Sequence, residues 1–572
     1  MNTTLQNNGR QLLVYLMLLS ALGAVIWKTI TLQVLEKSFL INQGDARIED
    51  TRELVATRGV ITDRNGKTLA MSTPLITLTA EPRKLDVDTL PLISRLTDVS
   101  LGTLKKRYQR SSSYMLIRRH MVPQEAEKIL ALRSENKGLR GLRSEAEYRR
   151  YYPAGEVTSQ IVGLTNVDEQ GQEGLELSFD SYLSGRNGKK SVLTDVYGQI
   201  IRDVELTAPA KNGTNLVLSI DLDLQYMAYR ELLAAVIRHK ARSGSLVILD
   251  VKTGDILAMV NQPSFNPNNR SKLSPGSMRN RAVTDAIEPG SVIKALTLSA
   301  ALETGKFTVD QMFNTSPGWR RINGYTIRDT HDYGVLSFEK VLIKSSNIGA
   351  SEIALKVGPQ KMFKTFHDFG LGQSTGIGFP GEANGVLPNR VNWKDIELAT
   401  LSYGYGLTVT PLQLAVAYAA IANHGKRVTP HIVLNDARVQ STQIISEKTA
   451  RLMTQMMEQV IENGTGKKAR SDLYRIAGKT GTAHKVGKHG YDDNRYAASF
   501  AGFAPVSNPR LAMIVSLDDV VGDEYYGGEV SAPVFGAVME QALRHLGVKP
   551  DKQNSDVKDY IASDIFSSGG NQ

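Results

Sequence analysis

Residues 291–294 read Ser-Val-Ile-Lys, residues 345–347 read Ser-Ser-Asn, and residues 479–482 read Lys-Thr-Gly-Thr. These motifs follow one another in a chain of 572 residues, and together they indicate a serine acyl-transfer site. A serine hydroxyl is a weak nucleophile at neutral pH, so it needs a base within hydrogen-bond distance. Residues three apart lie on one face of an α-helix, and this spacing predicts that Lys294 contacts Ser291.

The segment around Ser291 predicts a helix over residues 291–305. It is rich in Ala and Leu, ends in a Gly that suits a C-cap, and follows Pro289 and Gly290, which interrupt the chain. At a helix start, backbone N–H groups and the positive end of the dipole stabilise a developing oxyanion. The apolar neighbours of Lys294 predict its burial, which disfavours the ammonium form and makes lysine a usable base.

Each motif alone is unspecific, because further copies occur in the chain. A second Lys-Thr-Gly at 252–254 lies between apolar runs at 245–251 and 256–260, and this pattern predicts a hairpin turn. Gly372 to Gly376 fits the nucleophile elbow of another hydrolase fold but lacks the flanking strand and helix, so we interpret Ser374 as a loop residue. The other competing serines are Ser134, at the end of a charged helix predicted over 124–136, Ser264, and Ser337, which shares a local helix with Ser345.

Composition excludes several classes of function. The chain has no cysteine, which removes disulfides, thiol catalysis and zinc–thiolate sites. Its nine histidines form no H-E-x-x-H pattern, so we expect no metal and no cofactor. His484 lies two residues beyond Thr482 and could approach the cleft, but we favour a solvated loop residue. The net charge of +10 is spread among acidic residues without a basic block, which argues against a nucleic-acid partner.

One segment is apolar enough to span a membrane. Residues 11–27 carry no charge and fall slightly short of the roughly 20 residues that a bilayer core needs, and residues 29–35 can extend the span. A cleaved signal peptide is the alternative, but no clean cleavage site follows. We therefore predict an uncleaved anchor over 11–35, with a cytoplasmic stub at 1–10 and the rest of the chain on the other side.

The remaining chain predicts two domains of α+β class. Residues 36–206 predict an elongated, mostly β pedestal with inserted helices, and residues 207–213 suit a linker. Residues 207–548 predict helices packed around an antiparallel sheet, and the polar tail at 549–572 predicts disorder. Within this second domain we expect strands at 215–220, 479–483, 498–504 and 511–517, and helices at 222–239, 411–422 and 534–546.

The chain resembles class B penicillin-binding proteins, and most closely the division-specific peptidoglycan transpeptidases of Gram-negative bacteria. The resemblance runs from the anchor to about residue 547 and implies a penicillin-binding transpeptidase domain of serine β-lactamase-like fold on a membrane-tethered pedestal. It is carried by RGVITDRNG at 58–66, RRYYPAGE at 149–156, RNRAVTDAIEPGSVIK at 279–294, KSSNIG at 344–349, SYGYGLTVTPLQLA at 402–415 and AGKTGTA at 477–483.

The resemblance also implies a role for each motif residue. Ser291 is the expected acylated nucleophile and Lys294 its base, and the backbone N–H groups of Ser291 and Thr482 would form an oxyanion hole. Ser345 is expected to take part in proton transfer, and Asn347 is expected to orient the peptide. Lys479 would supply positive charge. Thr480, Gly481 and Thr482 would bind the substrate, with its terminal carboxylate against the two threonines.

The implied substrates are peptidoglycan stem peptides that end in D-Ala-D-Ala, which β-lactams imitate. The implied partners are a polytopic peptidoglycan glycosyltransferase and divisome membrane proteins, with the anchor in the bacterial inner membrane and the catalytic domain in the periplasm. The alternatives are an elongation-type enzyme, a specialised paralogue, a β-lactamase or carboxypeptidase, and a non-catalytic sensor or scaffold. The specialised paralogue stays open because the stub before Arg10 is shorter than the basic tail that the resemblance implies. A large anchored pedestal argues against a secreted hydrolase, and a scaffold need not retain every motif residue.

Overall fold

The computed structural model describes residues 3–39, 49–194, 200–434, 439–487, 490–522 and 524–552. The chain forms two compact units, and because it passes between them several times, neither unit is one continuous stretch. The predicted disordered tail lies outside the described residues from residue 553 onward. The first unit comprises Met1–Arg58, Pro74–Arg149 and Ser184–Gly213, and the second comprises Gly59–Thr73, Arg150–Leu183 and Thr214–Gln572.

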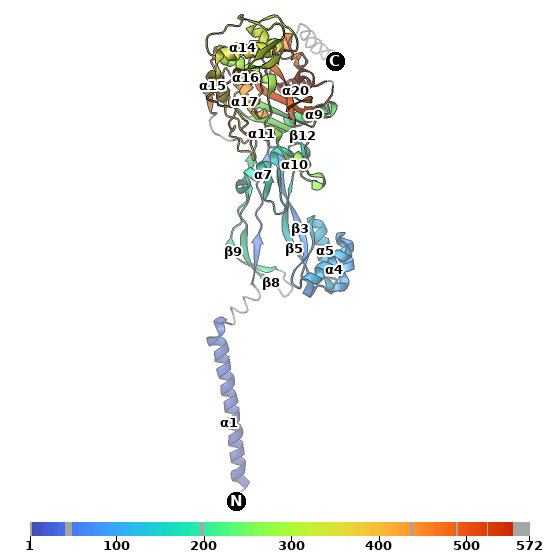
Figure 1. Ribbon diagram of the computed structural model, residues 1–572. Helices are drawn as coiled ribbons and strands as arrows, with labels where there is room; N and C mark the ends of the chain where they lie inside the picture. Colours follow the sequence, from blue (N-terminus) through green and yellow to red (C-terminus); the bar gives the residue numbers. More distant parts are fainter. Residues whose placement is uncertain are drawn as a thin grey trace, which may run out of the picture. The chain divides into compact units, whose positions relative to one another are not determined.

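The first unit begins with helix α1 (Thr3–Ile30), which continues into a π-helical turn at Thr31–Leu35 (Figure 1). Within the described residues, Arg10–Leu35 is the one helical segment long and apolar enough to cross a membrane. No part of this segment's apolar window is buried by the rest of the protein. This exposure fits a single-pass membrane anchor, as the sequence predicts.

Beyond α1, the first unit is mostly β with inserted helices, the composition that the sequence predicts for the pedestal. Strands β1 (Glu49–Leu54), β8 (Gly188–Thr194) and β9 (Ile200–Ala208) form an antiparallel sheet in the order β1-β8-β9. Because β9 continues to Ala208, the predicted linker at 207–213 is wrong in its first two residues. The other elements are the end of β3 (Thr68–Ala80), β4 (Met115–Met121), β5 (Leu142–Tyr151), α3 (Leu90–Thr97), α4 (Leu101–Arg110) and α5 (Pro123–Ala131), which is shorter than predicted.

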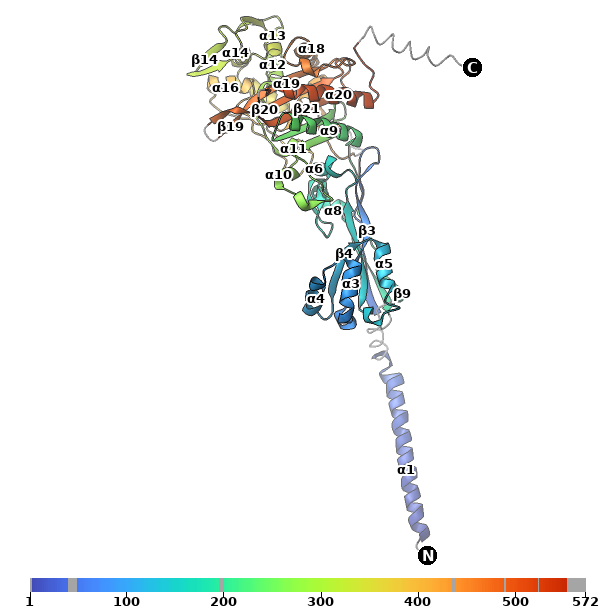
Figure 2. The same cartoon turned by 90° about the vertical axis from the view of Figure 1, so that its right-hand side faces the viewer.

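The second unit is built on a five-stranded antiparallel sheet, as predicted. Side chains along the central strands alternate: Leu246 and Ile248 join one hydrophobic cluster, while Val247 and Leu249 join another. Helices α9 (Leu222–Arg238) and α20 (Ala532–His545) cover one face, and α12 (Lys294–Leu302) and α17 (Pro411–Ala422) cover the other (Figures 1 and 2). The strand order is β12 (Ile256–Gln262), β11 (Ser243–Asp250), β21 (Leu511–Val520), β20 (Gly490–Ala504), β19 (Ala477–Gly487).

Local signals set several helix boundaries in this unit. Thr410 caps α17 through a capping box with Gln413, so the predicted helix 411–422 is confirmed at both ends. The helix predicted over 291–305 instead opens with a tighter 3-10 turn at Gly290–Ile293, and α12 then ends at Leu302. Gly305 lies beyond that end with a φ of +69°, in the left-handed region that terminates a helix. The strand predicted at 215–220 is reduced to β10 (Leu216–Val217).

The smaller elements of the second unit complete the fold around this sheet. They are β2 (Ile61–Thr62), α6 (Ser159–Val162), β6 (Leu164–Thr165), β7 (Gly171–Glu173), α7 (Gly174–Ser178), α8 (Asp180–Leu183), α10 (Pro275–Met278), α11 (Arg281–Thr284), β13 (Met312–Asn314), β14 (Trp319–Ile322), β15 (Tyr325–Arg328), β16 (Val335–Ser337), α13 (Phe338–Lys344), α14 (Asn347–Val357), α15 (Pro359–Asp368), α16 (Asp395–Ser402), β17 (Lys426–Val428), β18 (Ser441–Gln443), α18 (Glu447–Asn463) and α19 (Gly527–Val530).

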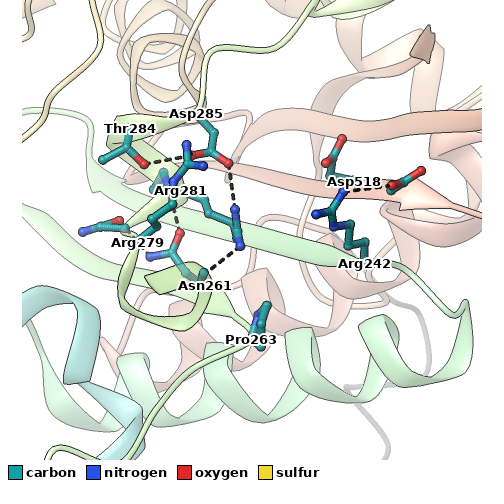
Figure 3. Close-up of polar contacts among 12 residues, drawn as sticks. Arg242, Asn261, Pro263, Arg279, Arg281, Thr284, Asp285 and Asp518 are labelled. Atoms are coloured by element: carbon teal, nitrogen blue, oxygen red, sulfur yellow. Dashed lines mark hydrogen bonds and ion pairs between the residues drawn. The ribbon is translucent and has the colours of Figure 1, made fainter. Parts of the chain in front are cut away.

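Polar contacts hold the chain that leads into the turn at Gly290–Ile293 (Figure 3). The carboxylate of Asp285 accepts hydrogen bonds from Arg279 at 2.6 Å, Arg281 at 2.9 Å and the Thr284 hydroxyl at 2.8 Å. Asn261 on β12 accepts from the backbone N–H of residue 282 at 2.8 Å. These contacts tie α11 to the edge of the sheet and so fix the direction from which the chain reaches Ser291.

Candidate active site

Ser291 and Lys294 face each other at the start of α12. Ser291 lies in the 3-10 turn and Lys294 is the first residue of α12, so their side chains lie on one side of the same helical stretch. Lys294 Nζ lies 3.0 Å from Ser291 Oγ, and the Lys294 side chain is fully buried. The contact predicted from the spacing of these two residues is therefore present.

The Ser345-Ser346-Asn347 motif occupies the junction between α13 and α14. Ser345 ends α13 with a φ of +60°, and Ser346 starts α14 by accepting a hydrogen bond from the Gly349 N–H at 2.9 Å. This bend directs Ser345 and Asn347 toward Lys294, whose Nζ lies 2.6 Å from the Ser345 carbonyl oxygen and 2.7 Å from Asn347 Oδ1.

Asp329 stabilises the junction between α13 and α14, and the sequence did not predict this role. Its carboxylate accepts from the backbone N–H of Asn347 at 2.5 Å, the N–H of Ile348 at 3.1 Å and the Ser346 hydroxyl at 2.6 Å. A carboxylate at a helix N-terminus is favoured by the free N–H groups and the helix dipole. No local sequence signal marks Asp329, because it lies far outside α14 along the chain and reaches the helix only through the tertiary fold.

Lys479 lies on edge strand β19 and, like Lys294, contacts the Ser345 side chain. Its Nζ lies 3.0 Å from Ser345 Oγ and 3.1 Å from the Thr480 carbonyl oxygen, and its side chain is fully buried. Ser345 Oγ also lies 3.2 Å from Lys294 Nζ, so this hydroxyl bridges two lysines. Three chain segments that are distant in sequence therefore meet at one hydroxyl group.

The residues after Lys479 alternate along β19. Thr480 and Thr482 line the cleft, whereas Gly481 faces the turn below Ser291. A Cβ atom at position 481 would lie 2.8 Å from the Pro289 carbonyl oxygen and 2.9 Å from a methyl group of Val292. Gly481 therefore allows β19 to pack directly against the turn that carries Ser291.

Burial determines the electrostatics of the two lysines. Burial lowers the pKa of Lys294 well below its ordinary value, the positive charge of Lys479 lowers it further, and Asp329 acts in the opposite direction. Burial alone lowers the pKa of Lys479 to about 7. A lowered pKa favours the uncharged amine, which can act as a proton acceptor, and Lys294 is the lysine adjacent to the Ser291 hydroxyl.

These side chains open into a cleft of about 540 Å³. Five of the eight predicted site residues line this cleft. Lys294 and Lys479 are fully buried beside it, and Gly481 faces the turn that carries Ser291. The cleft is lined by Ser291, Thr330, His331, Tyr333, Lys344, Ser345, Asn347, Tyr405, Thr465, Thr480, Thr482, His484, Tyr496, Tyr525, Tyr526, Gly528 and Glu529.

The cleft also contains His484, for which the sequence left this position open, and five tyrosines that the sequence did not predict as site residues: Tyr333, Tyr405, Tyr496, Tyr525 and Tyr526. The prediction of a solvated loop at His484 is wrong, because β19 continues to Gly487 and places His484 opposite Tyr496 with the rings 4.9 Å apart. The alternation that brings Thr480 and Thr482 to the cleft also brings His484 there, so this signal was present in the sequence. Thr465 contacts Thr480 through their hydroxyl groups at 2.7 Å, without any local motif.

The competing motifs lie elsewhere in the structure. Ser134 is exposed and donates to the Ala131 carbonyl oxygen at 2.8 Å, and Ser337 caps α13. Ser374 lies in a loop and donates to Glu382 at 2.8 Å, as predicted. The second Lys-Thr-Gly forms the turn between β11 and β12, which pair in antiparallel fashion. None of these residues lines the cleft.

Comparison with known proteins agrees with this arrangement. Residues 244–540 match the penicillin-binding protein transpeptidase domain, and residues 53–218 match the penicillin-binding protein dimerisation domain. The chain therefore belongs to the penicillin-binding protein transpeptidase family, and its two matched domains are those of the class B members.

Individual relatives extend over nearly the whole chain. "Peptidoglycan D,D-transpeptidase FtsI" of Escherichia coli is 41% identical over 560 residues, which cover 96% of this chain and 93% of that protein. "Probable peptidoglycan D,D-transpeptidase PbpC" of Pseudomonas aeruginosa is 39% identical over 551 residues, 96% of this chain and 97% of that protein. The crystal structure of penicillin-binding protein 3 of Mycobacterium tuberculosis complexed with aztreonam superposes with a TM-score of 0.68 at 28% identity, covering 88% of this chain and 98% of that one.

Proposed function

We propose that this chain is a serine peptidoglycan D,D-transpeptidase in which Ser291 is acylated and Lys294 is the base. Family membership supports the class of enzyme, because relatives at about 40% identity carry that activity in their names. One observation carries the residue roles: a fully buried amine lies 3.0 Å from Ser291 Oγ and has a pKa lowered well below its ordinary value.

The contacts of Lys294 suit a neutral amine. A neutral amine has two N–H donors and one lone pair, whereas an ammonium group has three donors and no acceptor. The Ser345 carbonyl oxygen at 2.6 Å and Asn347 Oδ1 at 2.7 Å can only accept, so they take the two N–H groups. Asn347 Nδ2 donates to the Arg328 carbonyl oxygen at 2.9 Å, which fixes the orientation of this amide. The lone pair is then left for a hydroxyl group. Ser291 Oγ at 3.0 Å is nearer than Ser345 Oγ at 3.2 Å, so we assign the lone pair to the Ser291 hydroxyl, whose proton it can accept.

Acylation follows from this proton transfer. Ser291 Oγ attacks the carbonyl carbon of the penultimate D-Ala as its proton passes to Lys294 Nζ, and the backbone N–H groups of Ser291 and Thr482 stabilise the oxyanion. The C–N bond to the terminal D-Ala then breaks, and the departing amine takes a proton through the Ser345 hydroxyl, which contacts both lysines. The proton that reaches the departing amine is the one held by Lys294 Nζ, 3.2 Å from Ser345 Oγ, so Lys294 becomes neutral again. An amine of a second stem then attacks the ester carbonyl and gives a proton to Lys294. As the ester C–O bond breaks, Lys294 returns this proton to Ser291 Oγ and restores its hydroxyl.

The threonine-bearing edge of β19 supplies the substrate contacts. We assign Thr480 and Thr482 to the terminal carboxylate of the donor, with Gly481 holding the strand against the turn and Lys479 providing positive charge below the cleft floor. Asn347 orients the peptide from the opposite wall. A β-lactam presents the same carboxylate and an acylating carbonyl group, so we propose that it acylates Ser291 in the donor's place.

The cellular setting is also part of the proposal. The apolar helix Arg10–Leu35 supports an anchor in the bacterial inner membrane, with residues 1–10 cytoplasmic and the catalytic domain in the periplasm. We assign residues 36–206 to the pedestal and 207–548 to the transpeptidase domain, and we place the enzyme in septal wall synthesis. Its partners are a polytopic peptidoglycan glycosyltransferase and divisome membrane proteins. Anchor deletion should release the protein from the membrane without preventing acylation by penicillin, and membrane retention would contradict the single-anchor assignment.

Labelling with a fluorescent penicillin, followed by peptide mapping, tests the site assignment. We expect one adduct, on Ser291, that is lost in Ser291→Ala and forms about 10²–10⁴ times more slowly in Lys294→Ala. Ser134→Ala and Lys137→Ala remove the matching pair of a competing S-x-x-K motif and should label as the wild type does. An adduct on Ser134, Ser337 or Ser374 would overturn the assignment.

A second measurement distinguishes a transpeptidase from a carboxypeptidase and from a non-catalytic sensor. Incubation of the full chain with a donor stem peptide and an acceptor amine should yield a cross-linked product. Hydrolysed donor alone would instead indicate a carboxypeptidase, and labelling by penicillin without any turnover of stem peptides would indicate a sensor.

A further inference from the structure

Strands β14 and β15 form a small antiparallel hairpin with the turn at Asn323 and Gly324, and Figure 2 labels β14 at the side of the second unit. The register pairs Trp319 with Arg328, Arg320 with Ile327, Arg321 with Thr326, and Ile322 with Tyr325. Residues directly opposite each other in an antiparallel pair share a face, and successive residues alternate between faces. One face therefore carries Trp319, Arg321, Thr326 and Arg328, and the other carries Arg320, Ile322, Tyr325 and Ile327.

The second of these faces anchors the hairpin to the catalytic unit. Ile327 is 3% exposed and packs in a hydrophobic cluster with Ile348 of α14 and Tyr403, and Ile322 packs against the same cluster. Arg320 forms an ion pair with Glu352 of α14 at 2.9 Å. The packing fixes the orientation of the hairpin and leaves its other face toward solvent.

All four residues of that other face, the hairpin outer face, are exposed. Trp319 is 47% exposed, whereas tryptophan side chains are highly buried on average. Arg321 donates to the Gly324 carbonyl oxygen at 3.3 Å, and within the described residues the Arg328 side chain has no hydrogen bond or ion pair. The face thus presents one indole ring and two guanidinium groups without any acidic residue.

The hairpin outer face continues into the catalytic cleft. Arg328 directly precedes Asp329, and its carbonyl oxygen accepts the hydrogen bond from Asn347 at 2.9 Å. The next residues along the chain, Thr330 and His331, line the cleft wall. Lys344 also lines the cleft and has no hydrogen bond or ion pair within the described residues. Basic side chains are therefore present both at the wall of the cleft and on the hairpin.

We propose that the hairpin outer face binds the peptidoglycan strand that carries a substrate stem peptide, with a sugar ring against Trp319 and stem carboxylates against Arg321 and Arg328. The inference rests on the proposed function and names a substrate contact beyond the reacting dipeptide. A planar guanidinium group matches a carboxylate through two parallel hydrogen bonds, and an indole ring offers a large apolar face to the C–H groups of a sugar. A strand bearing both groups complements this surface in charge and in shape.

The test uses the full chain in detergent and compares a large substrate with a small probe. The variant Trp319→Ala/Arg321→Gln leaves Arg328, whose backbone contacts Asn347, in place. We expect it to bind soluble, uncross-linked peptidoglycan strands about tenfold more weakly, and to lose part of the salt dependence of binding. Neither Trp319 nor Arg321 lines the cleft, so acylation of this variant by fluorescent penicillin should stay within about twofold of the wild-type rate.

Matched variants make the result specific. Tyr226→Ala/Arg238→Gln removes an exposed aromatic ring and an exposed arginine from α9 and should leave strand binding unchanged. Trp319→Phe retains an aromatic face and should retain most of the binding. Unchanged strand binding in Trp319→Ala/Arg321→Gln would overturn the proposal, as would an equal loss in the α9 variant.

Two further outcomes separate this proposal from the proposed function. If penicillin acylation falls together with strand binding, the hairpin supports the catalytic site and the strand-binding proposal is wrong. If the variant instead loses affinity for anionic lipid vesicles and keeps its affinity for strands, the surface binds membrane and the proposal is also wrong. Failure of the wild type to react with penicillin would contradict the proposed function, whatever the hairpin binds.

Discussion

The tripeptide Lys-Thr-Gly occurs twice in this chain, and the two copies occupy opposite environments. Residues 252–254 form the turn between β11 and β12, where Lys252 is exposed. Residues 479–481 lie on β19, where Lys479 is fully buried and burial lowers its pKa to about 7. The same three residues therefore build a connection in one place and part of a reactive cleft in the other.

Both glycines leave room for a neighbouring segment, but their backbones and neighbours differ. Gly254 has a φ of +79°, a backbone conformation that disfavours any side chain, and a Cβ atom there would lie 2.5 Å from the Thr429 carbonyl oxygen. Gly481 lies in a regular strand, and there a Cβ atom would meet Pro289 and Val292 in the turn below Ser291. The comparison shows that a short motif acquires its chemistry from the segments packed against it, so substitutions at matched positions should separate the two copies.

Substitution of the two lysines should give the largest difference. In Lys479→Ala we expect acylation by fluorescent penicillin to slow by about 10²–10³, because the cleft loses a buried positive charge that contacts Ser345. Lys252→Ala changes an exposed turn and should acylate at the wild-type rate. Stopped-flow labelling of both variants measures this, and equal rates would remove Lys479 from the site.

Substitution of Gly481 should lower the acylation rate, whereas substitution of Gly254 should lower the stability of the fold. Gly481→Ala pushes β19 away from the Ser291 turn and should slow acylation by about 10–10², because small misplacements of reacting groups are costly. Gly254→Ala strains a turn and should lower the free energy of unfolding by about 1–2 kcal/mol while acylation is retained. Thermal unfolding and labelling on the same samples check both, and an unchanged labelling rate in Gly481→Ala would contradict the close packing of β19.

The pH dependence of kcat/KM should also distinguish the two Lys-Thr-Gly tripeptides, with a smaller effect than the substitutions above. Lys479 loses its charge as the pH rises through about 7, so kcat/KM for a donor with a free carboxylate should fall by about tenfold per pH unit well above that value. Lys479→Arg keeps the charge and should move this alkaline limb to higher pH, whereas Lys252→Arg should leave the profile unchanged. A flat profile between about pH 7 and pH 9 would show that the charge of Lys479 does not matter for this step.

Much of this arrangement could be predicted from sequence because it depends on local signals. Capping by Thr410, the turn at 252–254 and the spacing from Ser291 to Lys294 are each set by a few neighbouring residues, and the structure has all three. The same holds for the apolar helix near the N-terminus.

The missed features depend on contacts between distant segments. Asp329 supports Asn347 from another element, and Thr465 reaches Thr480 across the fold. The left-handed conformation of Ser345 is imposed by the junction of two helices, since serine does not favour it by itself. Interleaving of the two compact units is likewise a property of the tertiary fold, because the segments that change unit carry no compositional mark.

The central claim is that Lys294 is uncharged beside Ser291 at neutral pH, and nitrogen NMR of the full chain with ¹⁵N-labelled lysine tests it directly. Comparison with Lys294→Arg assigns the resonance of Lys294 Nζ. The account predicts the chemical shift of a neutral amine at about pH 7.5, whereas an ordinary lysine keeps its charge to about pH 10. An ammonium signal for Lys294 that persists above about pH 9 would contradict the account.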